Sequence, residues 1–100
     1  MAATVELTRF KVTEDKTQAL LAARQVMLAD FHADPVGFLD ALLVRLPDEE
    51  WLDIVQWRSP EDFAASRAKG ANLPGIAAFL AAIDEVISSE QGIRTDGDDQ

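Results

Sequence analysis

Large apolar side chains occupy both faces of the segment Trp51–Trp57 (WLDIVQW). Successive side chains of a strand point to opposite faces, so Leu52 and Ile54 lie opposite Val55 and Trp57. Such a strand must be covered on both sides. This requirement limits the possible folds, because 100 residues form a single domain with few elements to do the covering.

Short β-rich segments alternate with helical ones along the rest of the chain. Pro35 and Gly37 end the first helical pattern, and the turn Pro47–Glu50 separates two strands as a hairpin. The predicted elements are a strand at Val5–Val12, a helix from Glu14 to about Ala33, a strand at Phe38–Leu46 buried on both faces, a strand at Trp51–Trp57, helical segments at Pro60–Lys69 and Ile76–Glu85, and a weak last strand at Val86–Arg94.

Two strand-to-helix junctions resemble each other in sequence. Residues 10–15 (FKVTED) and 57–62 (WRSPED) share an aromatic residue, a cation and a final Glu-Asp pair. Thr13 is expected to cap the first helix. Ser59 is expected to cap the second helix, with Pro60 at its first position. The Asp62 side chain is expected to accept a hydrogen bond from the backbone N–H of Ser59 in return. This similarity between the two junctions supports a fold built from two related halves.

The order β-α-β-β-α-β predicts an α+β, ferredoxin-like sandwich with an antiparallel sheet. Helices can cover only one face of that sheet, yet Val5 and Leu7 lie opposite Phe10 and Val12 on the first strand, so both faces are apolar. An extended apolar face indicates an interface. We therefore expect a homodimer through the open sheet face; a monomer with a few tolerated surface apolar residues is the alternative.

The net charge of −9 is concentrated at the end of the chain. Residues 84–100 contain six acidic residues against Arg94, whereas the other 83 contain twelve acidic and eight basic residues. We expect one domain at residues 1–94 and an acidic disordered tail at 95–100. A body without a basic cluster argues against nucleic acid and anionic membranes as partners. No leader-like or membrane-spanning segment is visible, so a cytoplasmic location is expected.

The chain contains no cysteine and only one histidine, His32, which removes the side chains that most metal sites use. Asp30, His32 and Asp34 resemble a ligand group, but on a helix His32 points away from the two aspartates, so we expect a solvated helix end. We expect neither a metal nor a cofactor.

Three segments carry a resemblance to a known family. They are VELTRFKVTED, GFLDALLVR and WLDIVQWRSPEDFAAS, of which Asp53–Phe63 is the most specific. Over about residues 4–94 the chain resembles the dimeric α/β-barrel superfamily, and within it the antibiotic-biosynthesis-monooxygenase-like group. The resemblance implies two ferredoxin-like subunits whose sheets together form a barrel, with a pocket between each sheet and its own helices. Members include cofactor-independent oxygenases of aromatic polyketides and haem-degrading enzymes.

The haem-degrading branch of this family uses three residues that can be compared with this chain. They are an asparagine on the first strand, a tryptophan at the end of the third, and an iron-ligating histidine on the following helix. Trp57 matches the tryptophan, but Thr8 stands at the asparagine position and Arg67, or Ser66, at the histidine position. Neither ligates haem iron as histidine does, so haem degradation is not expected.

The strand alternation predicts an aromatic-lined space between sheet and helices. This pattern is typical of a small-molecule pocket and equally of an ordinary core. The predicted substrate-binding residues are Thr8, Phe10, Trp57, Phe63, Arg67 and Phe79, with Arg67 receiving an anionic group.

Asp53 is the predicted catalytic residue, because a carboxylate among apolar neighbours is costly to bury unless it is paired. Burial raises the pKa of such a group and suits it to remove a proton from a phenol or an anthrone. The competing interpretation is a structural ion pair with Arg67, Arg9 or Arg58. Glu6 is a possible second acid at the rim, although exposure is the simpler expectation.

Two functions remain open at this point. The first is a cofactor-independent, monooxygenase-like enzyme acting on an aromatic or quinol-like small molecule, and the second is a non-catalytic ligand-binding or assembly module on the same dimeric fold. The break between Gly70 and Gly75 could gate the pocket or be a plain kink.

Overall fold

The computed structural model describes residues 2–33, 37–70 and 74–96. The elements follow the order β1 (Thr4–Lys11), the 3₁₀ helix η1 (Glu14–Lys16), α1 (Thr17–Ala33), β2 (Phe38–Arg45), β3 (Glu50–Trp57), α2 (Pro60–Gly70), α3 (Pro74–Ala81) and β4 (Glu85–Ile93). This confirms the predicted order, with the second helical segment in two pieces. Residues 71–73 of the predicted break, and 97–100 of the predicted tail, lie outside the described part.

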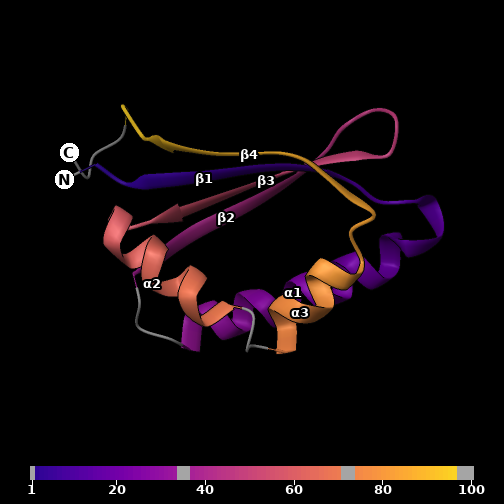
Figure 1. Cartoon of the computed structure of the whole chain (residues 1–100), viewed down its shortest axis with the longest axis horizontal. Helices are drawn as coiled ribbons and strands as arrows, with labels where there is room; N and C mark the ends of the chain where they lie inside the picture. Colours follow the sequence, from indigo (N-terminus) through magenta and orange to yellow (C-terminus); the bar gives the residue numbers. More distant parts are fainter. Residues whose placement is uncertain (1, 34–36, 71–73, 97–100) are drawn as a thin grey trace.

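The four strands form one antiparallel sheet in the order β2-β3-β1-β4, and α1, α2 and α3 lie on the same side of it (Figure 1). The predicted ferredoxin-like α+β fold is therefore confirmed. No helix or strand of the described residues lies on the other face of the sheet. This arrangement leaves the open face that the alternation of β3 predicts.

The register of β1 against β3 determines which side chains reach the helices. Thr8 lies opposite Asp53, and Phe10 lies opposite Trp51. Directly paired residues share a face of the sheet. Trp51, Asp53, Val55 and Trp57 are all buried, as expected of the helix-covered face, whereas the residues between them are half-buried.

The predicted burial of the second strand on both faces is wrong for the single chain. β2 is an edge strand in which no residue is buried, and Leu39 and Leu42 are about half exposed. The prediction rested on a continuous apolar run, which cannot distinguish a central strand from an edge strand whose outer face lacks a partner.

Two predictions near the end of the chain also need correction. The last helix ends at Ala81 instead of Glu85, and beyond its end the Asp84 carboxylate accepts hydrogen bonds from the Thr13 N–H and from Lys16 Nζ, both at 2.7 Å. The strand expected to be weak is a nine-residue strand that pairs with β1 from Thr4 to Lys11, with one register shift between Arg9 and Phe10. Pairing with a central strand overrides the low β-propensity of serine and glycine.

The predicted caps are confirmed in part. Ser59 Oγ accepts the Asp62 N–H at 3.1 Å, as the capping motif predicts, but the Asp62 carboxylate binds Arg58 at 2.8 Å instead of answering back to the cap. Thr13 makes no side-chain capping bond.

The hairpin turn between β2 and β3 is confirmed, with positive φ angles of 64° at Asp48 and 65° at Glu49, as a type I′ turn requires.

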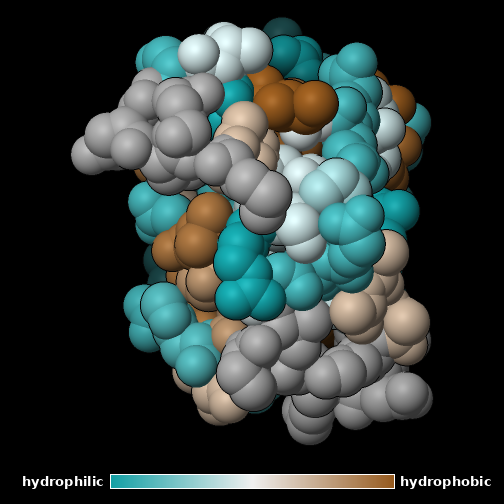
Figure 2. Space-filling model, turned by 90° about the vertical axis from the view of Figure 1, so that its left-hand side faces the viewer, coloured by the Kyte–Doolittle hydropathy of each residue, from teal (hydrophilic) through white to brown (hydrophobic). Residues whose placement is uncertain are grey.

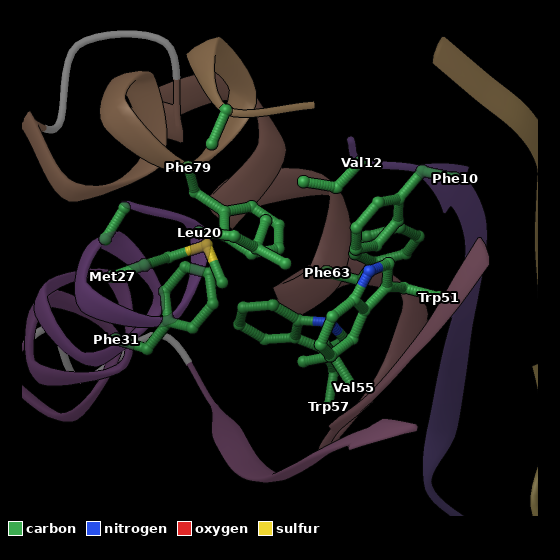
Figure 3. Close-up of a cluster of buried hydrophobic side chains, with 12 residues drawn as sticks. Phe10, Val12, Leu20, Met27, Phe31, Trp51, Val55, Trp57, Phe63 and Phe79 are labelled. Carbon is green, nitrogen blue, oxygen red and sulfur yellow. The ribbon is translucent and has the colours of Figure 1, made fainter. Parts of the chain in front are cut away.

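The core lies between the sheet and the helices. Side chains from β1, β3, α1, α2 and α3 converge there, and Phe10 and Leu20 are completely buried (Figure 3). At the end of the molecule formed by α2, the start of β1 and the end of β4, the coloured surface is mostly hydrophilic with small apolar patches (Figure 2). Within the described residues, no helix has both the length and the apolar character that a membrane span needs.

Candidate functional site

A pocket of about 380 Å³ lies between the sheet and the three helices. Its exposed lining residues are Arg67 on α2, Leu80 on α3, and Val86 and Ser89 on β4, so the mouth opens between these three elements. The deeper walls come from α1, β1 and β3. Volumes of this size are typical of small-molecule sites.

The helix side of the pocket and the end of β3 are apolar and aromatic. Trp57 stacks on Phe63, with ring centroids 5.9 Å apart and planes 24° apart, and Phe31 meets the Trp57 ring edge-on at 5.2 Å. Met27 and Phe79 face the same space from α1 and α3 (Figure 3). A flat aromatic ligand would find stacking partners on this wall.

The sheet side of the pocket carries polar groups. Thr8 of β1 pairs with Asp53 of β3 on one side and with Ser89 of β4 on the other, so the three form one row across the sheet. Glu6 lies on the same face, two residues before Thr8 on β1, and also lines the pocket. The pocket therefore combines a polar floor with an aromatic wall.

Asp53 is buried, and its partner is Arg24 of α1. Arg24 Nη1 donates to Asp53 Oδ1 at 2.7 Å, and the two side chains are only 8% and 9% exposed. Burial raises the pKa of Asp53, while the charge and the hydrogen bond of Arg24 oppose that rise. Asp53 is thus ion-paired, but with Arg24, and the expected partners Arg67, Arg9 and Arg58 are wrong.

The three arginines expected as partners of Asp53 bind elsewhere. Arg9 points to the open face and pairs with Glu50 at 2.9 Å, and Arg58 pairs with Asp62. Arg67 lies at the pocket mouth, over the Phe63 ring at 5.2 Å from its centroid, and donates to Ser89 Oγ at 3.4 Å. Arg9 lies on the opposite face of the sheet from Asp53, and the positions of Arg58, just before α2, and of Arg67 on α2 direct them to other partners.

Glu6 lies in the pocket, so the expectation that it is exposed is wrong. Its side chain is 20% exposed, its Oε1 accepts a long hydrogen bond of 3.4 Å from Trp57 Nε1, and its Oε2 is 3.9 Å from Arg67 Nη2. Burial raises the pKa of Glu6, and the negative charge of Asp53 adds to that rise, whereas Trp57 and Arg67 oppose it.

Of the seven predicted site residues, six line the pocket. They are Thr8, Asp53, Trp57, Phe63, Arg67 and Phe79. Phe10 does not: it is completely buried in the core behind Phe79, whose ring it meets edge-on at 5.7 Å. Phe10 points to the predicted face of β1, but the Phe79 side chain of α3 lies between it and the pocket.

Arg24 was missed and Glu6 was expected to be exposed, although the sequence contains a signal for each. Arg24 stands within the apolar stripe of α1, four residues after Leu20 and three before Met27, where a buried cation requires an anion. Glu6 shares the parity of Thr8 and Phe10 and therefore belongs to the helix-covered face. Periodicity assigns both side chains to the inner face of their elements, but not their partners or their place in the pocket.

The group Asp30-His32-Asp34 forms no ligand set among the residues that the structure places. Asp30 Oδ2 accepts the Gly75 N–H at 3.2 Å, and His32 is exposed against the edge of Phe38. Asp34 lies outside the described residues. Within those residues, no group of three His, Cys, Asp or Glu side chains could hold a metal ion.

The sequence and the fold were compared with those of known proteins. No family model and no curated protein matches the sequence. An antibiotic biosynthesis monooxygenase-like protein from Chloroflexus aurantiacus matches with a TM-score of 0.72 at 18% identity, covering 96% of both chains. SnoaB, a cofactor-independent oxygenase from Streptomyces nogalater, matches with a TM-score of 0.70 at 23% identity, covering 98% of this chain and 96% of that one.

A third similar structure is a dimeric ferredoxin-like protein from an uncultured marine organism, with a TM-score of 0.71 at 10% identity over 97% of this chain and 91% of that one. Identities this low establish the fold and leave the activity open. The predicted resemblance is thus confirmed at the level of architecture: this chain has the ferredoxin-like fold of the antibiotic biosynthesis monooxygenase-like proteins.

Proposed function

We propose that this protein is a small homodimeric, monooxygenase-like enzyme that acts on an aromatic or quinol-like small molecule and needs no metal or flavin. The observation that carries the proposal is the pocket itself, in which an aromatic wall faces a polar floor with one buried carboxylate, Asp53, and one half-buried carboxylate, Glu6. The similarity of fold to SnoaB, a cofactor-independent oxygenase, supports the same reaction class.

The chemistry requires few groups. An organic molecule reacts directly with dioxygen once it has become a carbanion or a phenolate, so a base and a pocket that excludes water are the minimum equipment. Trp57, Phe63 and Phe79 supply the stacking surfaces, and Arg67 at the mouth can orient an anionic group. Asp53, held by Arg24, supplies negative charge at the floor.

The dimer forms, in this proposal, through the open face of the sheet. Directly paired side chains of β1, β2 and β3 make this face apolar, the contributing residues being Val5, Leu7, Leu42, Val44, Leu52 and Ile54. They are half-buried or exposed in the single chain. Burying them against a second copy removes apolar surface from water, and the dimeric ferredoxin-like neighbour supports this arrangement.

Ligand binding can be tested with the protein's own tryptophans. Trp57 lines the pocket, whereas Trp51 is buried elsewhere on β3 and does not line it. In a Trp51→Phe variant, Trp57 is the single fluorophore, and titration with hydroquinones, phenols and anthrone under nitrogen should quench its emission. The matched control is Trp57→Phe, whose remaining Trp51 should respond little. If no member of these classes changes either Trp57 emission or the melting temperature, the proposed ligand class is wrong.

A second function is favoured by the tight Arg24–Asp53 pair, which ties α1 to β3 and suits a structural role. On this alternative, the protein is a non-catalytic ligand-binding module. Oxygen uptake separates the two: an enzyme consumes dioxygen when a bound quinol is present, and a binding module quenches Trp57 fluorescence without consuming oxygen.

A further inference from the structure

The two carboxylates of the pocket differ in the partners that hold them. Asp53 is bound at 2.7 Å by a buried guanidinium, whereas Glu6 has only a long 3.4 Å bond from Trp57 Nε1 and an arginine nitrogen at 3.9 Å. This difference determines which interactions each carboxylate loses when it is protonated.

Protonation of Asp53 would leave the Arg24 guanidinium without its anion. Arg24 is 6% exposed, so water cannot replace the lost partner, and an unpaired buried charge is strongly unfavourable. Although burial raises the pKa of Asp53, protonating it would therefore cost the Arg24 ion pair as well.

Protonation of Glu6 has no such consequence. Its cationic neighbour Arg67 has a side chain that is 62% exposed at the mouth and also contacts Ser89 and the Phe63 ring, so water solvates the guanidinium when Glu6 becomes neutral. The charged groups that face Glu6 are Arg67 from α2 and Asp53 from β3. The fixed negative charge of Asp53 favours the neutral form of Glu6, in line with its raised pKa.

We propose that Glu6 is the group that accepts a proton from the bound aromatic ligand, while Asp53 stays charged on Arg24. This inference rests on the proposed function, since it requires an aromatic acid in the pocket. For a carbon acid such as anthrone, the methylene C–H bond breaks, the proton moves to a Glu6 carboxylate oxygen, and the electron pair enters the conjugated ring system as an enolate. The reverse transfer returns a proton to carbon, so the step is balanced without an oxidant.

Hydrogen exchange tests this step separately from oxygenation. Anthrone is incubated with the protein in D₂O under nitrogen, and incorporation of deuterium at its methylene carbon is followed by NMR at several pD values. Glu6→Gln keeps an oxygen that can accept from Trp57 but cannot take up a proton, so the exchange rate at saturating anthrone should fall about 100-fold. The dissociation constant of anthrone should change less than about threefold, and Glu6→Asp should recover part of the rate. Glu61→Gln, on the exposed side of α2, is the matched control and should keep the wild-type rate.

The outcomes separate this inference from the proposed function. Exchange that depends on Glu6, with an ionisation in its pD profile that disappears in Glu6→Gln, supports the inference. Binding of anthrone without exchange, or exchange that survives in Glu6→Gln and is lost in Asp53→Asn, overturns it while leaving an aromatic-binding pocket. Absence of anthrone binding in the wild-type protein, and of binding by the phenols and hydroquinones, overturns the proposed function and this inference together. Should Asp53→Asn fold poorly, the pD profiles of the wild type and Glu6→Gln still decide the question.

Discussion

The Asp53 carboxylate of β3, which lines the pocket, meets the Arg24 guanidinium of α1 at 2.7 Å, and both side chains are less than one-tenth exposed. The pair joins the two layers of the fold at the position where the ligand would lie. Removing one member of such a pair is far more harmful than removing both, because the remaining charge stays buried.

The first prediction concerns this pair. Arg24→Met should lower the free energy of unfolding by about 3–5 kcal/mol, measured by urea denaturation. Arg58→Met is the control: that arginine is 63% exposed and pairs with Asp62 one turn away, so its loss should cost less than about 1 kcal/mol. The double variant Arg24→Met with Asp53→Leu should recover much of the lost stability. Equal losses in Arg24→Met and Arg58→Met would contradict the importance of the buried pair.

The second prediction concerns the pH dependence of stability through Glu6. Because the folded-state pKa of Glu6 lies above its ordinary value of 4.5, the folded protein binds this proton more tightly than the unfolded chain. Its contribution to stability is therefore fully present below about pH 4.5 and is lost as the pH rises through the folded pKa. Glu6→Gln should gain stability relative to the wild type as the pH rises over this window, measured by urea denaturation from about pH 4 to about pH 8.

Asp84 provides a control of opposite sign for this pH series. Hydrogen bonds from Lys16 and from the Thr13 backbone lower the pKa of Asp84 below 3.8, so its contribution is present above that value and is lost as the pH falls through the folded pKa. Asp84→Asn should therefore be less stable than the wild type at neutral pH, with the difference shrinking in acid. The same pH trend in both variants would contradict the assignment of the two shifts.

The third prediction concerns the oligomeric state. The wild-type protein should sediment with the mass of two chains of 10.9 kDa at micromolar concentration. Ile54→Glu places a charge at the centre of the open sheet face, opposite Leu7 and Leu42, and should give the mass of a single chain. Val26→Glu is the matched control on α1, where the side chain is 51% exposed, and should leave the dimer intact. A single-chain mass for the wild type would refute the proposed dimer.

The fourth prediction concerns the contact between α1 and α3, which positions Phe79 in the pocket. A Cβ atom on Gly75 would lie 2.6 Å from the backbone nitrogen of Met27, so Gly75→Ala should push the helices apart and cost about 1–3 kcal/mol of stability. Gly92→Ala is the control, because no atom lies within 4 Å of its added Cβ. Thermal unfolding of the two variants measures the difference, and an unchanged melting temperature in Gly75→Ala would contradict the close crossing.

Much of the fold could be predicted because it depends on local patterns. Alternation predicted that Thr8, Asp53 and Trp57 share the helix-covered face, and the Ser59 cap predicted where α2 begins. The continuous apolar run Phe38–Leu46 predicted a strand correctly but its burial wrongly, since position within a sheet depends on which strands pair with it. The strength of β4 was underestimated for the same reason.

The sequence by itself determined the order of the elements, the parity of each strand and an aromatic wall with an aspartate facing it. Only the tertiary structure decided that Arg24 is the partner of Asp53, that Glu6 lies in the pocket with a loosely held carboxylate, and that Phe10 lies behind Phe79. The physical reason is that periodicity assigns each side chain to a face of its own element. The pairing of charges and the sequence of layers behind a pocket depend on how separate elements are placed against one another.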